Sequence, residues 1–210
     1  MNEFTFEKQE NAVLETCEWD KTWIDRTQDK TTFRVLYIGD SISCATRTVA
    51  TELSGYSMIF DGFGTSKGLD NPYYQSSLKA FAVQEPKRDA ILFNNGLHGW
   101  HLEDTGDYLT HYDAMISFLL SEFPDNPVYI VLTTAITDPW DCRVKVRNES
   151  AIKVAQKYRL PVIDLYAPID ANRHLVTPDK IHLTDDGYKL IARKILDTLS
   201  TRLHASTKGR

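Results

Sequence analysis

Arg34-Val-Leu-Tyr-Ile-Gly-Asp-Ser-Ile-Ser43 is the stretch of the chain that decides the fold. Its first six residues form a short, largely apolar run that ends at glycine, which predicts a buried strand. Ser41 follows almost at once, and residues 46–55 then have a helical pattern. A serine in this place lies at the carboxyl edge of a sheet and near a helix N-terminus, where backbone N–H groups point at whatever its hydroxyl attacks.

The same alternation of short apolar runs and helical patterns continues along the chain. Further strands are expected at residues 57–60, 90–93, 127–132 and 161–164, and further helices at 73–83, 105–122, 146–158 and 185–203. Strands that alternate with helices predict an α/β fold, a three-layer α/β/α sandwich whose five-stranded parallel sheet is covered on both faces. Ligands of such sheets bind outside the carboxyl ends of the strands, so functional residues are expected just after strands.

The chain reads as one domain, because it holds no repeat, low-complexity tract or linker, and its 210 residues suit a single core. We place the domain at residues 34–204. Residues 1–33 are polar and irregular, and we expect them to be an N-terminal extension that packs on the domain. Residues 205–210 are expected to be a tail.

The composition is ordinary for a globular protein, with 42% hydrophobic and 25% charged residues and a net charge of −5. This mild acidity argues against a nucleic-acid partner, which needs clustered Lys and Arg. No run approaches the ~18 apolar residues of a membrane span, and no signal peptide is recognisable, so we expect no membrane partner and a cytoplasmic location. Three widely spaced cysteines, Cys17, Cys44 and Cys142, indicate neither a disulfide framework nor a zinc site.

The chemistry of the chain is expected to involve Ser41, Asp179 and His182. A serine nucleophile needs a base within hydrogen-bond reach, and that base needs a carboxylate to orient it. Asp179 and His182 are three residues apart in one loop, so the carboxylate can hold one ring nitrogen while the other faces the serine. Each motif also has a plain structural explanation: Ser41 can cap its helix, and the Asp-x-x-His pair can belong to a helix start.

The order of these motifs resembles the SGNH (GDSL-like) hydrolases. Gly39-Asp-Ser-Ile42 after the first strand, and Asp179-Lys-Ile-His182 ahead of the last helix, look like the first and last sequence blocks of that family. The similarity covers about residues 34–200 and implies the flavodoxin-like SGNH fold and serine esterase activity. The residues around Ser41 read Gly39-Asp-Ser-Ile-Ser43 and so lack the second glycine of the α/β-hydrolase motif Gly-x-Ser-x-Gly.

The resemblance also implies an oxyanion hole made by three sequence blocks. The first would supply the backbone N–H of Ser41. The second normally supplies a glycine N–H, and Gly64, or Gly62, is the candidate in Asp61-Gly-Phe-Gly-Thr-Ser-Lys67. A glycine there can equally serve the conformation of the loop.

The third block departs from the family pattern Gly-x-Asn-Asp. The chain reads Phe93-Asn-Asn-Gly-Leu-His98, and alignment on the glycine puts His98 where the asparagine belongs. An imidazole N–H or an amide N–H can each donate to an oxyanion, so His98 is the first candidate and Asn95 the alternative. Asn-Asn-Gly is also common in plain turns.

Three more residues are candidates for substrate contacts: Asp40, Trp100 and Trp140. The two tryptophans follow strands, so both are expected at the mouth of a pocket, although buried structural tryptophans are equally compatible with the sequence. His98 and His101 invite a metal interpretation, but a third ligand at a sensible spacing is missing, so we expect neither metal nor other cofactor.

The function implied by the resemblance is hydrolysis of short-chain esters, chiefly acetyl esters, with an O-acetyl group on a carbohydrate as the leading substrate. The partner would be a small-molecule or oligosaccharide ester. Two alternatives stay open: an acyltransferase that uses the same serine, and a non-catalytic carbohydrate-binding protein on the same fold. The oligomeric state is left open by the sequence.

Overall fold

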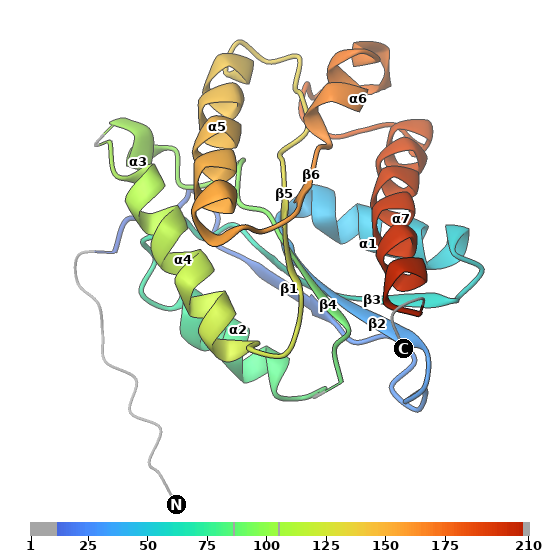
Figure 1. The fold of residues 1–210 in the computed structure, drawn as a ribbon. Helices are drawn as coiled ribbons and strands as arrows, with labels where there is room; N and C mark the ends of the chain where they lie inside the picture. The colour runs from blue at the N-terminus through green and yellow to red at the C-terminus, as the bar shows by residue number, and fades with distance from the viewer. Residues whose placement is uncertain (1–11, 86, 105, 208–210) are drawn as a thin grey trace, which may run out of the picture.

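The computed structural model describes residues 12–85, 87–104 and 106–207, and its centre is a six-stranded sheet (Figure 1). The strands lie in the order β1-β3-β2-β4-β5-β6. Their bounds are β1 Asp20–Trp23, β2 Phe33–Gly39, β3 Met58–Thr65, β4 Ala90–Phe93, β5 Val128–Val131 and β6 Val162–Ile163. Strands β2 to β6 pair in parallel, which confirms the predicted five-stranded parallel arrangement.

The sixth strand, β1, comes from the segment that we had read as irregular. It pairs antiparallel with β3 at the edge of the sheet, from Asp20 opposite Thr65 to Trp23 opposite Gly62. All four of its residues are exposed, so it lacks the apolar alternation that would mark a strand in the sequence. Strand β3 runs to Thr65 and not to residue 60, because it pairs with β2 as far as Gly64 and with β1 from Gly62 to Thr65.

Helices cover both faces of the sheet (Figure 1). One face carries α1 and α7, and the other carries α2, α4 and α5. The helices are α1 Ser41–Leu53, α2 Tyr74–Ala82, α3 His101–Asp104, α4 Tyr108–Glu122, α5 Asp141–Tyr158, α6 Tyr166–Asp170 and α7 Asp185–Thr207, with a 3-10 turn at Arg173–Leu175. In the described part of the chain, none of them has the length and apolar character needed to cross a membrane.

Strand β2 shows why both faces are covered. Val35 and Tyr37 belong to the apolar cluster under α1 and α7, whereas Leu36 and Ile38 belong to the cluster under α2, α4 and α5. Successive side chains of a strand point to opposite faces, so a continuous apolar run requires a cover on each side.

The topology places Ser41 at a change of direction in the sheet. From β2 the chain passes through α1 to β3 on one side, and from β4 it proceeds through β5 to β6 on the other. The two halves separate at the carboxyl ends of β2 and β4, which is where open α/β sheets bind their ligands. Ser41 is the first residue of α1, directly after β2.

Several helix ends differ from the expected ones. Helix α1 begins at Ser41 and not at residue 46, because Asp40 caps it. Helix α5 begins at Asp141, five residues early, and α7 continues to Thr207, past the expected end near residue 203. Residues 208–210 of the expected tail and residues 1–11 of the expected extension lie outside the described residues.

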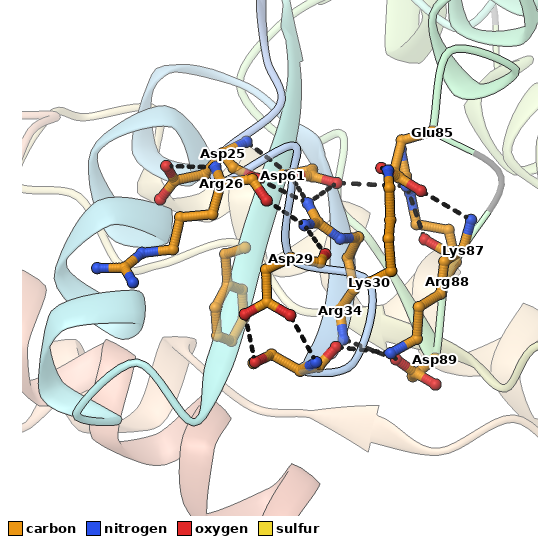
Figure 2. Close-up of polar contacts among 12 residues, drawn as sticks. Asp25, Arg26, Asp29, Lys30, Arg34, Asp61, Glu85, Lys87, Arg88 and Asp89 are labelled. Atoms are coloured by element: carbon orange, nitrogen blue, oxygen red, sulfur yellow. Dashed lines mark hydrogen bonds and ion pairs between the residues drawn. The ribbon is translucent and has the colours of Figure 1, made fainter.

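A buried ionic network holds the loop between β1 and β2 against the sheet (Figure 2). The Arg34 guanidinium is fully buried and donates to the carbonyls of Asp25, Arg26 and Asp29. The same guanidinium donates to Asp61 on β3 at 2.8 Å. Arg34 therefore ties the described part of the N-terminal segment to the central strands.

Candidate active site

Ser41 occupies the first turn of α1 with its hydroxyl available. The cap of this helix is Asp40, whose carboxylate accepts the N–H of Ile42 at 2.9 Å. The neighbouring hydroxyl of Ser43 donates to the Asp40 carbonyl at 2.7 Å. The sequence also allowed Ser41 to serve only as the helix cap, but in the structure Asp40 caps the helix.

The structure brings Ser41, His182 and Asp179 together. Nε2 of His182 lies 2.8 Å from Oγ of Ser41, and Nδ1 lies 2.7 Å from Oδ2 of Asp179. With the proton on Nδ1, Nδ1–H donates to the carboxylate and Nε2 accepts from the serine hydroxyl. This is the arrangement in which imidazole acts as a general base towards a serine nucleophile.

The loop before α7 fixes the two partners by its own hydrogen bonds. Lys180 donates its N–H to the carbonyl of Thr177 at 2.8 Å and takes a φ of 72°. Oδ1 of Asp179 accepts the N–H groups of Ile181 and His182, each at 2.9 Å, and the hydroxyl of Thr177 at 2.8 Å. These bonds, led by the one from Ile181, hold the pKa of Asp179 well below its usual range. The carboxylate of Asp179 is therefore charged at neutral pH.

Asp40 does not reach substrate space. Only 2% of it is exposed, and its cap bond occupies one carboxylate oxygen. Burial raises the pKa of Asp40, while His98, the backbone N–H groups of the first turn and His182 pull it down. The structure thus makes Asp40 a buried helix cap next to Ser41, and this burial disfavours the substrate contact expected from the sequence.

The second-block glycines lie in a strand and not in a loop. Ser66 donates its N–H to the carbonyl of Trp19 at 3.1 Å, and alternate residues of a strand face the same neighbour, so the N–H of Gly64 also faces β1. A Cβ added at Gly64 would lie 2.1 Å from Sγ of Cys44. Gly64 is required for the close approach of α1, and its N–H points away from Ser41.

Gly68 is a second-block candidate that the sequence reasoning missed. It is buried in the loop after β3, and the preceding carbonyl, that of Lys67, accepts from Nδ2 of Asn95 at 3.1 Å. In a trans peptide the C=O and the N–H point in opposite directions, so Asn95 aims the N–H of Gly68 away from itself. We expected this glycine within residues 61–67, as part of the loop after the strand. Most of these residues belong to β3, and the loop begins after Thr65.

The two asparagines of the third block have partners of their own. Nδ2 of Asn94 donates to the carbonyl of Val131 at 2.8 Å and to Oγ1 of Thr133 at 2.9 Å. Asn95 is 3% exposed and directs its amide nitrogen to the loop after β3. These three bonds use the amides for positioning, which makes His98 the third-block candidate that the contacts favour.

His98 lies in the loop after β4 with its ring held on two sides. The ring meets Trp19 edge to face, at 5.8 Å between centroids, and Nδ1 lies 3.7 Å from a carboxylate oxygen of Glu15. The backbone of the same loop is held separately, because Arg147 donates to the carbonyls of His98 and Gly99. The loop that carries His98 follows β4, whose parallel neighbour β2 leads directly into the turn with Ser41.

Comparison with known proteins bears on the fold of the chain. No family model and no curated protein matches the chain. The acetyl xylan esterase AlAXEase matches with a TM-score of 0.63 and 20% identity, over 79% of this chain and 99% of that one. A member of the lipolytic protein G-D-S-L family from Veillonella parvula matches with 0.62 and 21%, over 80% and 99%. The family 3 carbohydrate esterase of Clostridium thermocellum matches with 0.62 and 17%, over 81% and 98%.

The chain has the SGNH hydrolase fold. Of the six strands of this chain, the five parallel ones match our expectation for the SGNH fold, and the antiparallel edge strand β1 is an addition to it.

A pocket of about 520 Å³ opens beside the loop that carries Asp179 and His182. Lys180 and Ile181, the two residues between Asp179 and His182, form part of its wall. Trp100 and Trp140 line it as well, as their positions after strands had suggested. Its volume is in the range of small-molecule sites.

The two tryptophans differ in how firmly they are held. Trp100 has the guanidinium of Arg147 at 4.0 Å and that of Arg143 at 5.0 Å from its ring centroid, and it packs on the core. Trp140 is 47% exposed and meets Trp100 edge to face at 5.2 Å. Trp140 thus offers an aromatic surface to a ligand, and Trp100 supports it.

The histidine pair considered as a metal site is divided between two partners. Nε2 of His101 lies 2.8 Å from Asp70, whereas His98 faces Glu15 and Trp19. Among the described residues, no group of three or more His, Cys, Asp and Glu side chains is placed to hold a metal ion.

Proposed function

We propose that the chain is a serine esterase of the SGNH hydrolase family. The observation that carries this proposal is the relay from Ser41 through His182 to Asp179, with separations of 2.8 and 2.7 Å. The relay lies at the carboxyl edge of the parallel sheet, where ligands of α/β folds bind. The similarity of the fold to structures named as esterases and G-D-S-L proteins supports the same conclusion.

The reaction is acyl transfer in two steps. His182 takes the proton from Ser41 as the serine oxygen attacks the ester carbonyl, and Asp179 holds the imidazole tautomer and stabilises the imidazolium. The proton then passes to the leaving alcohol as the C–O bond breaks. Water attacks the acyl-enzyme with His182 as base again, which releases the acid and restores Ser41.

The oxyanion is stabilised by donors from three segments. The backbone N–H of Ser41 lies at the N-terminal end of α1, where the helix dipole favours negative charge. Gly68 and His98, from the loops after β3 and β4, are the other two donors in this proposal. Preorganised donors of this kind typically contribute the largest share of the rate enhancement.

The substrate is proposed to be a short-chain ester, chiefly an acetyl ester on a carbohydrate. The pocket beside the triad has room for a sugar ring, and Trp140 can stack on its apolar face. Several structures with this fold carry the name acetyl xylan esterase or carbohydrate esterase. The three cysteines are free thiols, as is usual for proteins of the cytoplasm. The proposed substrate is accordingly a small-molecule or oligosaccharide ester of that compartment.

The test is hydrolysis of p-nitrophenyl acetate, butyrate and octanoate by the wild type, Ser41→Ala and Ser43→Ala. We expect acetate to be cleaved fastest, and Ser41→Ala to lose about 10⁶-fold in kcat, as in other triads that lose their nucleophile. Ser43→Ala removes a hydroxyl from the same turn and should retain turnover, because that hydroxyl donates to the Asp40 carbonyl and not to His182.

Equal turnover by the wild type and Ser41→Ala would refute the esterase proposal. Sugar binding without turnover would favour the non-catalytic alternative. Transfer of the acetyl group to an added sugar in place of water would favour the acyltransferase.

A further inference from the structure

The described part of the N-terminal segment lies across both loops that follow the central strands. We call residues 15–20 the brace. Its Trp19 forms a reciprocal pair with Ser66 after β3: the Trp19 N–H donates to Oγ of Ser66 at 2.8 Å, and the Ser66 N–H donates to the Trp19 carbonyl at 3.1 Å. Asp20 accepts from Nζ of Lys67 at 2.7 Å. The brace therefore holds the two residues that directly precede Gly68.

The same segment also holds the loop after β4. A carboxylate oxygen of Glu15 accepts the N–H of Gly99 at 2.7 Å, across 84 residues of sequence, and lies 3.7 Å from Nδ1 of His98. The indole of Trp19 meets the His98 ring at an interplanar angle of 83°. Glu15 is itself fixed, because its N–H donates to Glu18 at 3.0 Å.

The two braced loops touch each other. A Cβ added at Gly99 would lie 2.7 Å from Cα of Gly68, so the loops meet backbone to backbone. A change in either loop is thus transmitted to the other. The brace is anchored at its far end by the pairing of β1 with β3 and by Arg34 in the buried network (Figure 2).

We propose that Glu15 and Trp19 are positioning residues, which hold His98 and the N–H of Gly68 in the geometry that receives the oxyanion. This inference rests on the proposed function. Oxyanion donors act only when they are fixed before the reaction, and a misplacement of about 1 Å can cost about 100-fold in rate. His98 lies on a loop, and the side of its ring that bears Nδ1 is supported only by the brace among the described contacts of that ring.

The experiment is a double-mutant cycle on p-nitrophenyl acetate with Glu15→Ala, His98→Ala and the double variant. We expect His98→Ala to lower kcat by about 10²- to 10³-fold, the loss typical of one oxyanion donor. Glu15→Ala should lower kcat by about 10- to 100-fold with KM little changed. In the His98→Ala background, Glu15→Ala should cost less than about 3-fold, because the residue it positions is gone.

Two matched variants separate positioning from folding. Glu15→Gln retains an oxygen that accepts the N–H of Gly99 and should recover most of the lost kcat. Trp19→Leu should lower kcat. Trp23→Leu is the control: Trp23 lies in the adjoining strand β1 and is 52% exposed, so its replacement should leave kcat unchanged. Melting temperatures of all variants establish that the folded protein is being compared.

The possible failures are distinguishable. If turnover depends on Ser41 but the losses from Glu15→Ala and His98→Ala multiply fully, the positioning role is refuted and the esterase function stands. If turnover does not depend on Ser41, the proposed function is refuted and the positioning role falls with it.

Discussion

The buried network around Asp61 makes a demanding prediction for stability. Its carboxylate lies 2.8 Å from Arg34 and 3.3 Å from Arg88, and at most 2% of any of these three side chains is exposed. Asp61→Asn keeps the shape but leaves two buried guanidinium groups without their anion. Breaking a buried ion pair in this way costs about 3–5 kcal/mol. For 210 residues, the entropy of unfolding is about 0.44 kcal/mol/K, so Tm should fall by about 7–11 °C.

The assay is thermal unfolding followed by circular dichroism, with Asp113→Asn as the matched control. Asp113 pairs with Lys157 at 2.7 Å, but the two side chains are 32% and 57% exposed, so its loss should cost less than about 1 kcal/mol and shift Tm by no more than about 2 °C. If Asp61→Asn melts within about 2 °C of Asp113→Asn, the argument from desolvated charge is refuted.

Further predictions concern the triad, the pocket and one helix end. Asp179→Asn should lower kcat by about 10⁴-fold in steady-state assays with little change in Tm, because the amide favours the wrong imidazole tautomer. Since the pKa of Asp179 is lowered in the folded chain, its ionisation stabilises the fold above the unfolded pKa of about 3.9, and this contribution is lost as the pH falls through the lowered folded pKa. Any difference in Tm between wild type and Asp179→Asn that comes from this ionisation should therefore shrink below about pH 4, and a difference that stays the same from about pH 5 down to about pH 2 would contradict the assignment. Trp140→Ala should raise KM for an acetylated sugar by about 10-fold while KM for p-nitrophenyl acetate changes little, since only the sugar needs the ring face. Arg159→Gly should raise Tm by about 1–2 °C, because Arg159 ends α5 at a φ of 55° where glycine is unstrained; a lower Tm would mean that the side chain is needed there.

The parts of the fold that the sequence predicts are those whose pattern is local. The strand at residues 34–39 is buried on both faces, so it reads as an uninterrupted apolar run. Asp179 and His182 are close in the sequence and are brought together by one loop, so their partnership needs no knowledge of the rest of the chain. The position of Ser41 could be predicted from the topology alone, because residues directly after the first strand of the parallel sheet lie at the edge where ligands bind.

The parts that the sequence did not predict depend on contacts between distant segments. Strand β1 has four exposed residues and no periodicity, and it exists because the edge of β3 accepts it. Residues 61–65, which we expected to be a loop, are strand because β3 pairs with β2 as far as Gly64 and with β1 from Gly62 to Thr65, and the donor that we propose for the second block is therefore Gly68 and not Gly64. Asp40 was expected to touch substrate, but the depth of the turn that buries it is set by packing around α1 and not by the motif.

The two halves of the candidate site are consequently built in different ways. The proposed nucleophile and its proposed base are held by bonds within single turns, such as the three bonds that Oδ1 of Asp179 accepts from its own loop. The proposed oxyanion donors lie on two loops that are joined through the brace, where Glu15 contacts Gly99 and Trp19 contacts Ser66. A change in the brace should therefore alter the stabilisation of the oxyanion while the separations within the triad persist. Since transition-state charge is stabilised by donors fixed beforehand, such a change affects kcat more than substrate binding.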